Sequence, residues 1–327
     1  MGGTGGPEGI RARPGMYAGD AYHLMWEVIA NALDLYLRRE ATEIRVELGA
    51  DSWVTVRDDG PGIPPDQIET IFTKLFPNGY DRHVPHVHLT SDLRGAGLCP
   101  VNALCSHLDV DTASGGLRYQ IAFERGRIVS PLRQVGAAFV EGTSVRFHPD
   151  PTIFPSIVLD QDVIATRLQE LAWLNPYLRL YFQNRRLESR GGIASWLGPT
   201  RPGFATQHTH GGVTVDLALG WTDSRHTNVR CFVNMTETTD GTHLDGIWDG
   251  LSRIAGWSRE DTRDALAPGF VAIVAVGLHR PELANPTKDH LTHPLVGEAV
   301  SRAIQELPDP ALQAFVVEQL AGRQTIA

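Results

Sequence analysis

A carboxylate and a carboxamide lie one helical turn apart near the start of the chain. Glu27, Asn31 and Asp34 have the spacing i, i+4, i+7 within a helical pattern over residues 20–39, so they share one helix face. Three polar groups that share one face could act together in a functional site. Taken alone, the pattern is most typical of a solvated helix face, so both interpretations stay open.

A second carboxylate comes at the end of a strand. In the strand expected over residues 53–57, Val54 and Val56 point to one face, and alternation carries Asp58 to the same apolar side. A partly buried carboxylate needs hydrogen-bond donors, and the exocyclic amine of adenine is a donor that guanine lacks at that position. The alternative is an ordinary Asp-Gly turn, because glycines follow at Gly60 and Gly62.

A glycine-rich turn opens a later helix. Gly95 and Gly97 would let a ligand approach the backbone, and the start of the helix offers unpaired N–H groups and the positive end of the helix dipole. The pattern predicts an anion such as phosphate at this turn. Two glycines alone are equally consistent with a packing or turn role.

These three elements, in this order, resemble the nucleotide-binding boxes of the GHKL ATPase superfamily, and within it the ATPase and transducer region of gyrase B and type IIA topoisomerases. The segments WEVIANALD, VTVRDDGPGIP and LRGAGLCPVNALCS match the three boxes. Further on, FVNMTETTDGTHLDG and FVAIVAVGLHRPELANPTKDHL are similar to the transducer domain with its lysine loop. The resemblance extends from Ile10 to about Leu320.

The resemblance implies an α+β fold in two parts. Residues 1–200 would form a GHKL (Bergerat) α/β sandwich ATPase domain. Residues 201–327 would form a smaller α+β transducer domain, ribosomal protein S5 domain 2-like. The family's DNA-cleavage (TOPRIM) domain has no counterpart in the sequence, so we expect the chain to be unable to cleave DNA alone.

The resemblance also implies ATP and Mg²⁺ as cofactors and a role for each matching residue. Glu27 would be the general base that orients the attacking water, and Asn31 would hold Mg²⁺. Asp58 would accept the adenine amine, and Thr143 would support the base through a water. Lys288 would reach the γ-phosphate from the second domain. The other implied nucleotide contacts are Gly60, Gly62, Ile63, Arg94, Gly95, Ala96, Gly97 and Leu98.

The chain departs from the family pattern at four places. Pro286 stands where the lysine loop usually has glutamine, which would remove one hydrogen bond to the γ-phosphate. Pro61 replaces a common arginine at the pocket rim, and Arg94 replaces the usual histidine of the third box. Only nine residues precede Ile10, so we expect a short N-terminal arm and less secure dimer formation on ATP binding.

Hydrophobic periodicity predicts the elements that position these residues. Residues 77–94 lack periodicity and are expected to form a long loop, which is typical of a lid. The Gly- and Pro-rich residues 198–212 are expected to form a linker. Strands are expected over 43–48, 53–57, 108–112, 117–124, 144–147, 178–183, 213–221, 228–235 and 270–278. Helices are expected over 20–39, with Asp20 as the N-cap, and over 66–76, from 97, over 164–174 and 243–254, and twice at the C-terminal end.

Composition excludes several classes of protein. The length of 327 residues suits two domains, and no apolar run is long enough to span a membrane. The net charge of -9 argues against tight unaided DNA binding. Three cysteines without CxxC spacing indicate reduced thiols in a cytoplasmic protein.

Two weaker constellations carry histidine or acidic side chains. The segment HVPHVH (residues 83–88) and the pair His208 and His210 lack cysteine or carboxylate partners at metal-ligand spacing, so polar loops are favoured over metal sites. The acidic turn TETTDGTH (residues 236–243) is expected to cap a helix rather than to form a second catalytic site.

Three functions remain open on the sequence. The resemblance favours an ATPase of a topoisomerase-like machine, with a homodimer on nucleotide binding and a partner protein that supplies DNA cleavage; whether the chain acts on DNA stays open. The second is an ATP-dependent small-molecule enzyme recruited from a gyrase B ATPase module. The third is a slow ATP-gated clamp for a partner protein.

Overall fold

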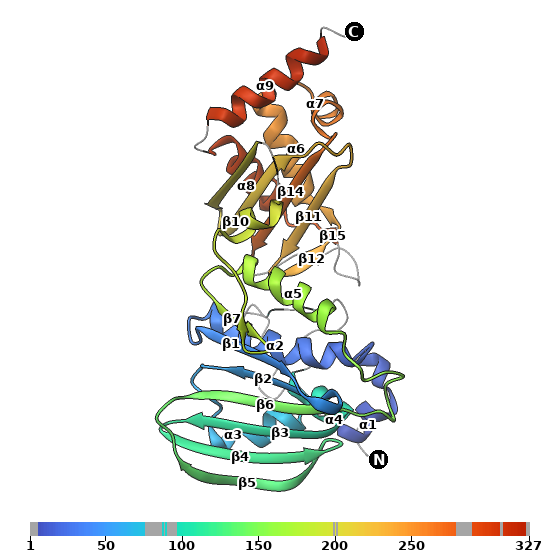
Figure 1. The fold of residues 1–327 in the computed structure, drawn as a ribbon, viewed down its shortest axis with the longest axis vertical. Coiled ribbons are helices and arrows are strands. Elements are labelled where there is room, and N and C mark those ends of the chain that lie inside the picture. Colours follow the sequence, from blue (N-terminus) through green and yellow to red (C-terminus); the bar gives the residue numbers. More distant parts are fainter. Residues whose placement is uncertain are drawn as a thin grey trace. The chain divides into compact units, whose positions relative to one another are not determined.

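A computed structural model of the chain describes residues 6–75, 87, 89, 97–198, 200, 202–278, 290–307 and 310–324. The backbone separates into two units, residues 1–189 and 190–327 (Figure 1). The sequence analysis placed this division after residue 200, and the structure places it after residue 189. The reason is that the short helix η3 (Gly192–Leu197) packs against strands of the second unit. Within the described part of the chain, every helix is too short or too polar to cross a bilayer.

Alternating apolar side chains build an eight-stranded sheet in the first unit. Its order is β5-β4-β3-β6-β2-β1-β7-β8, with β1 and β7 parallel and the other described neighbours antiparallel. The strands are β1 (Glu43–Leu48), β2 (Val54–Asp58), β3 (Cys105–Ser114), β4 (Leu117–Glu124), β5 (Arg127–Ala137), β6 (Gly142–Pro149), β7 (Arg179–Phe182) and β8 (Arg185–Arg186).

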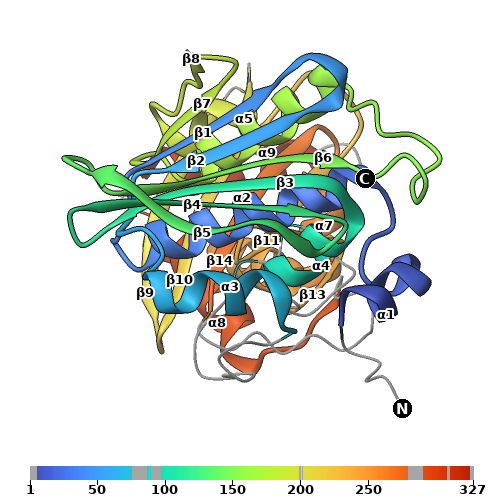
Figure 2. The same ribbon diagram turned by 90° about the horizontal axis from the view of Figure 1, so that it is seen from below.

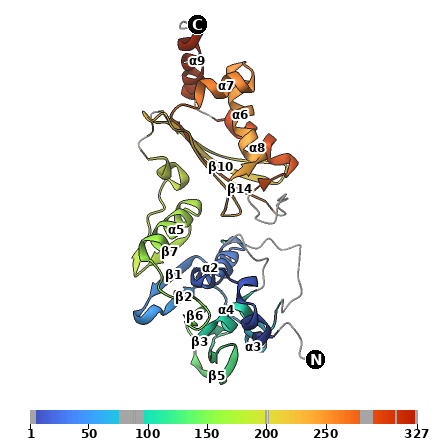
Figure 3. The same cartoon turned by 90° about the vertical axis from the view of Figure 1, so that its right-hand side faces the viewer.

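Helices cover one face of this sheet, where α2, α3 and α4 lie together (Figure 2 and Figure 3). The carboxylate of Asp20 caps α2 by accepting a hydrogen bond from the His23 backbone N–H at 3.1 Å, as the sequence predicts. Leu24, Ile29 and Leu33 of α2 are fully buried beneath the sheet. The helices are α1 (Pro7–Ala12), η1 (Pro14–Met16), α2 (Ala21–Leu37), η2 (Ala50–Ser52), α3 (Pro65–Thr73), α4 (Leu98–Leu104) and α5 (Gln161–Leu174).

The second unit has a five-stranded sheet and a separate parallel pair of short strands. The sheet order is β12-β11-β14-β10-β9, and β13 pairs with β15. Its elements are β9 (Gly203–His210), β10 (Val213–Trp221), β11 (Asn228–Val233), β12 (Thr236–Thr238), β13 (Asp240–Gly241), α6 (Thr242–Ala255), α7 (Arg259–Leu266), β14 (Phe270–Gly277), β15 (His290–Leu291), α8 (Pro294–Gln305) and α9 (Pro310–Gln324).

The predicted linker over residues 198–212 is wrong for most of its length, because β9 occupies Gly203–His210 and pairs with all but the end of β10. Gly211 and Gly212 form the two-residue turn of this hairpin, and both have positive φ angles of 59° and 80°. Such a turn requires positive φ at both positions, which glycine adopts without strain. The Gly-Gly pair therefore marks a hairpin, and the alternation before it marks a strand.

Several elements besides β9 were not anticipated, and α1, β5 and α7 are among the longest of them. Helix α7 carries its own signal, because the Ser258 hydroxyl accepts from the Asp261 backbone N–H at 3.1 Å and donates to the Asp261 carboxylate at 2.6 Å. The strands expected over 43–48, 117–124 and 213–221 are confirmed with the same bounds.

Glycines let helices α6 and α8 approach closely. A Cβ built on Gly246 would lie 2.5 Å from the carbonyl oxygen of Gly297 on α8, and one on Gly250 would lie 2.9 Å from the Cβ of Ile304. Both distances are shorter than van der Waals contact. The two helices therefore pack closely at this crossing, where a Cβ on Gly246 would also lie 2.8 Å from the Cβ of Val300. Ile247 and Val300 are both buried in the core of the second unit.

We predict that Gly246→Ala destabilises the second unit, although the same exchange inside an unconstrained helix stabilises by roughly 0.5–1 kcal/mol. The added methyl group has a backbone atom in its way, which cannot move without shifting α8. Urea unfolding of the variant measures the change. Gly15→Ala is the matched control, because nothing lies within 4 Å of a Cβ at Gly15. A variant as stable as the wild type would show that the helices separate at no cost.

Candidate functional site

Two consecutive carboxylates at the end of β2 have opposite surroundings. Asp59 faces the open side and accepts hydrogen bonds from the Thr42 backbone N–H and hydroxyl and from the Glu43 N–H, at 2.6–2.7 Å, with Arg179 at 3.3 Å. Partial burial raises the pKa of Asp59, but these donors outweigh it and the pKa is lowered. Asp58 points the other way, as strand alternation requires, into the protein.

Asp58 is a half-buried residue whose carboxylate lies largely out of water and has few donors among the described residues. Its Oδ1 accepts the Gly60 backbone N–H at 2.9 Å, and the backbone N–H of Thr143, its partner on β6, also favours the ionised form. Desolvation outweighs both donors and raises the pKa of Asp58 from 3.8 to about 6. The carboxylate therefore favours a ligand that brings a further hydrogen-bond donor.

A buried threonine joins the turn after Asp58 to the sheet. The Thr112 hydroxyl on β3 accepts the Ile63 backbone N–H at 2.9 Å and lies 3.1 Å from the Thr143 hydroxyl on β6. It also lies 3.3 Å from the carbonyl oxygen of Gly142. Both hydroxyls are buried. Thr143 was predicted as a site residue and Thr112 was not; the signal is its alternation with Leu108 and Val110 on the inner face of β3.

Two glycines after Asp58 are required by close contacts. A Cβ on Gly60 would lie 2.8 Å from Leu35 of α2 and 2.9 Å from the Asp58 carboxylate. Gly62 has a φ of +71°, and its Cβ would lie 2.0 Å from the carbonyl oxygen of Ala113. Any larger side chain at either position would displace the turn that carries Ile63.

Helix α2 supplies the second set of polar groups. Asp34 is buried and accepts the Val87 backbone N–H at 2.7 Å, so the interpretation of a fully solvated face is wrong at this position. The Glu27 side chain is 16% exposed, with its Oε1 4.0 Å from His23 Nε2. Asn31 is exposed, and its side-chain N–H donates to the Glu27 carbonyl oxygen at 2.6 Å. This bond orients the Asn31 amide oxygen away from the helix axis.

The predicted phosphate turn is described only at its end. Gly97 has a φ of +73° and precedes α4, whose first residue is Leu98. Arg94, Gly95, Ala96 and Lys288 lie outside the described residues, as do Pro286 and most of the loop expected over residues 77–94.

The comparisons with known proteins fit this arrangement. Residues 17–152 match the model of the histidine kinase-, DNA gyrase B- and HSP90-like ATPases, and residues 194–315 match the DNA gyrase B model. The first unit is a GHKL ATPase domain. The second is the gyrase B transducer domain, so the predicted α+β fold in two parts is confirmed.

Relatives cover nearly the whole chain. The DNA gyrase B protein of Thermus thermophilus is 35% identical over 92% of this chain, and that of Thermotoga maritima is 32% identical over 92%. The chain spans 54% of the length of each. The crystal structure of the 43K ATPase domain of Thermus thermophilus gyrase B, in complex with an aminocoumarin, has a TM-score of 0.79 and 29% identity, and covers 97% of this chain and 94% of its own.

A further gyrase B structure has the same fold. The gyrase B protein of Myxococcus xanthus has a TM-score of 0.77 and 25% identity, and covers 96% of this chain and 99% of its own.

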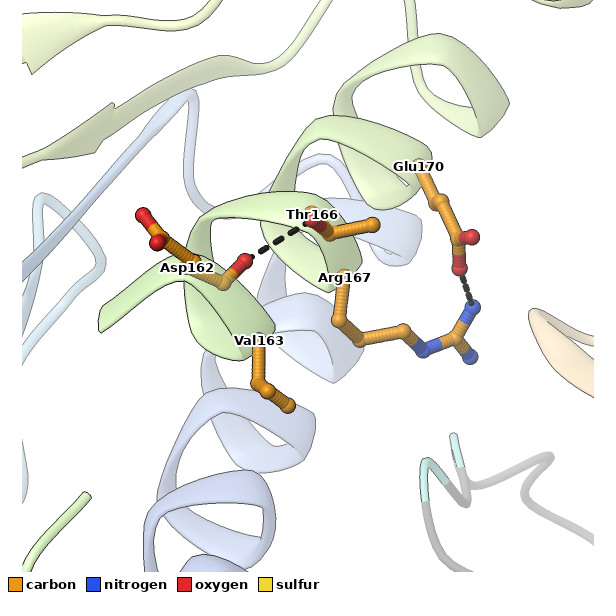
Figure 4. Close-up of a pocket in the computed structure, with 5 residues that line it drawn as sticks. All are labelled: Asp162, Val163, Thr166, Arg167 and Glu170. Carbon is orange, nitrogen blue, oxygen red and sulfur yellow. Dashed lines mark hydrogen bonds and ion pairs between the residues drawn. The ribbon is translucent and has the colours of Figure 1, made fainter. Parts of the chain in front are cut away.

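Two hollows on the described surface are lined by residues outside the GHKL site. Figure 4 shows one on α5, lined by a single helix, where Arg167 pairs with Glu170 at 2.8 Å and the Thr166 hydroxyl donates to the Asp162 carbonyl. Another lies between α6 and α8. Neither includes Glu27 or a group of β2, so nothing in them adds to the site.

The histidine pair lies in a strand and not in a loop. His208 and His210 are on β9, stacked with ring centroids 6.4 Å apart. His208 Nδ1 is 3.5 Å from Glu306, and His210 Nε2 is 3.5 Å from Glu298. These contacts connect β9, an edge strand of the sheet, to helix α8 and to the C-cap residue of that helix. Residues 83–86 and 88 of the other cluster lie outside the described residues.

The acidic turn over residues 236–243 does not cap α6 as predicted. Gly241 is the N-cap residue and makes no side-chain hydrogen bond. Glu237 pairs with Arg230 at 2.7 Å, and Asp240 pairs with His290 at 3.1 Å. His243 lies in the first turn, where burial lowers its pKa to about 4. The acidic side chains therefore tie strands together.

We predict that Asp58→Asn stabilises the unliganded protein above pH 6. Because folding raises the pKa of Asp58 from 3.8 to about 6, the folded state binds the proton more tightly, and stability falls as pH rises through this window. The shift corresponds to a loss of at most ~3 kcal/mol of unfolding free energy in the wild type, and the uncharged amide of the variant avoids this loss. Urea unfolding between about pH 4 and about pH 8 measures it. If the unfolding free energies of variant and wild type differed by the same amount at both pH values, the desolvation of this charge would be contradicted.

We also predict that Gly62→Ala destabilises the first unit more than Gly115→Ala. Both glycines have positive φ, +71° and +62°, so both variants carry the same backbone strain of about 1–2 kcal/mol. Only the methyl group at position 62 meets another atom, the Ala113 carbonyl. The difference in unfolding free energy isolates this contact, and equal losses would mean that the turn shifts freely.

Proposed function

We propose that the chain binds ATP with Mg²⁺ in its GHKL domain and hydrolyses it. The observation that carries this is the Asp58 carboxylate, which lies largely out of water at a strand end, accepts backbone N–H groups of Gly60 and Thr143 and has its pKa raised to about 6. A hydrogen bond from an amine N–H to this carboxylate would offset part of its desolvation. The exocyclic amine of adenine has that chemistry. Thr143 is the strand partner of Asp58, and its hydroxyl would hold a water against the base.

The residues of α2 suit the phosphate end. Mg²⁺ prefers oxygen ligands and keeps several waters, and the amide oxygen of Asn31 is such a ligand on an exposed surface. When bound, Mg²⁺ would neutralise charge on the phosphates. Glu27 lies one turn before Asn31 on the same face, and its mostly buried carboxylate would accept the proton of the attacking water.

Other groups are assigned by their match to the family. The backbone around Arg94, Gly95, Ala96, Gly97 and Leu98 would cradle the phosphates. Gly60, Gly62 and Ile63 would line the base pocket. Lys288, from the transducer domain, would contact the γ-phosphate, so that its position depends on the nucleotide and hydrolysis can move the domains.

We propose a topoisomerase-like setting for this ATPase. Gyrase B relatives at 32–35% identity support it. The chain would form a homodimer on nucleotide binding and work with a partner that cleaves DNA. Cys99, Cys105 and Cys231 are buried thiols without disulfide bonds, which suits the reducing cytoplasm.

Steady-state phosphate release with Mg-ATP tests the proposal. We expect Glu27→Gln to lower kcat about 10²–10⁴-fold, because the amide cannot accept the proton, while nucleotide affinity stays unchanged. Glu47→Gln, on the other side of the sheet, is the matched control and should keep full turnover. Asp58→Asn should instead weaken ATP binding.

The outcomes separate the candidate functions. Turnover stimulated by DNA supports the topoisomerase-like setting. Full activity in Glu27→Gln would refute the assignment of the base. Activity that needs a small molecule, or that produces AMP or a phosphorylated product, would refute simple ATP hydrolysis.

A further inference from the structure

Three polar side chains lie in register across three neighbouring strands of the first sheet. Asp58 of β2 is paired with Thr143 of β6, and Thr143 is paired with Thr112 of β3. Residues directly opposite each other in a sheet point to the same face, so one carboxylate and two hydroxyls form a row. We call Asp58, Thr143 and Thr112 the polar row.

The polar row lies on the covered face of the sheet. Thr112 is 1% exposed and Thr143 is 8% exposed. Val56 and Val110, two residues earlier on β2 and β3, are buried on the same face. Because little water reaches the two hydroxyls, their hydrogen bonds have to be made with protein groups or with a ligand.

The contacts of Thr112 use the full capacity of a hydroxyl. Its oxygen accepts the Ile63 backbone N–H at 2.9 Å and lies 3.1 Å from the Thr143 hydroxyl oxygen and 3.3 Å from the Gly142 carbonyl oxygen. A hydroxyl has one proton to donate and two lone pairs that accept. Since a carbonyl can only accept, all three contacts are hydrogen bonds only if Thr112 donates to the carbonyl and accepts from the other two groups.

This assignment fixes the direction of the Thr143 hydroxyl. Its single proton points to Thr112, so its oxygen has only lone pairs left for any other group. The ionised Asp58 carboxylate likewise only accepts. The polar row therefore offers acceptors alone to a ligand that reaches both residues.

We propose that Thr112 is a positioning residue that keeps Thr143 an acceptor and thereby selects a base with an exocyclic amine over one with a keto oxygen. This inference rests on the proposed adenine contact at Asp58. Thr112 would not touch the nucleotide, since it acts through the Thr143 hydroxyl. A keto oxygen placed against acceptors alone would lose its water without gaining a donor, and an amine avoids this cost.

A water held by Thr143 fits the same selection. If the Thr143 oxygen only accepts, such a water gives it one proton and has one proton left for the base. The ring nitrogen beside the amine is an acceptor in adenine and carries a proton in hypoxanthine. The water would therefore match adenine at this second position as well.

Thr112→Val tests the inference, because valine has a similar shape and lacks the hydroxyl. The Thr143 proton would lose its acceptor and could turn toward the ligand. The measurement is the dissociation constant of ATP and that of inosine triphosphate, whose base has a keto oxygen in place of the amine. We expect the preference for ATP, the ratio of the two constants, to fall about tenfold, roughly the effect of one hydrogen bond.

Two further variants separate specificity from stability. Thr112→Val also removes the acceptor of the Ile63 N–H and should lower Tm, but a ratio of two constants measured on the same folded protein does not depend on that loss. Thr112→Ser keeps the hydroxyl and should keep the wild-type ratio. Thr55→Val, the same exchange on the opposite face of β2, is the matched control and should also leave the ratio unchanged.

The decisive comparison repeats Thr112→Val in a Thr143→Ala background. If Thr112 acts through the Thr143 hydroxyl, the exchange no longer changes the ratio there. An unchanged ratio in Thr112→Val alone, or the same change in both backgrounds, would overturn the inference. Wild-type protein that binds no ATP, or binding that Asp58→Asn leaves intact, would instead refute the proposed function on which it rests.

Discussion

In the first unit, one carboxylate is held largely out of water with few hydrogen-bond donors around it. Asp58 stands at the end of an apolar strand, so the folded protein bears the cost of its desolvation at neutral pH. Two hydrogen bonds hold the turn that follows it. The Gly60 backbone N–H donates to the Asp58 carboxylate, and the Thr112 hydroxyl on β3 accepts the Ile63 backbone N–H. With the proposed adenine contact, this loss of stability is the compromise that is common at functional positions.

The next residue, Asp59, has the opposite surroundings, although it is only one position further along the chain. Asp59 has the same chemistry, yet it faces outward and its pKa is lowered by donors from Thr42 and Glu43. Exchanging the two environments would need a one-residue slip of β2, which would turn Val54 and Val56 to solvent. The apolar pattern of the strand thus decides which aspartate can meet a ligand.

The transducer domain depends on close backbone approach. Gly246 allows α8 to pack on α6, and Gly241 allows β15 to lie against β13. Both contacts are made by glycines whose neighbours are backbone atoms, so they cannot relax by rotating a side chain. Asn234 adds a side chain that takes the place of a strand backbone at Leu278. Backbone contacts therefore hold the domain together at each of these places.

The sequence by itself determined the strands with clear alternation, the cap at Asp20 and the direction of Asp58, because these follow from local periodicity. It misread residues 203–210 as linker, since turn-forming composition hid the pairing with β10. Only the tertiary structure decided that Asp34 is buried against Val87, and that Asp240 contacts His290. Such contacts join residues far apart in the chain, and no local pattern encodes which distant backbone group a polar side chain will meet.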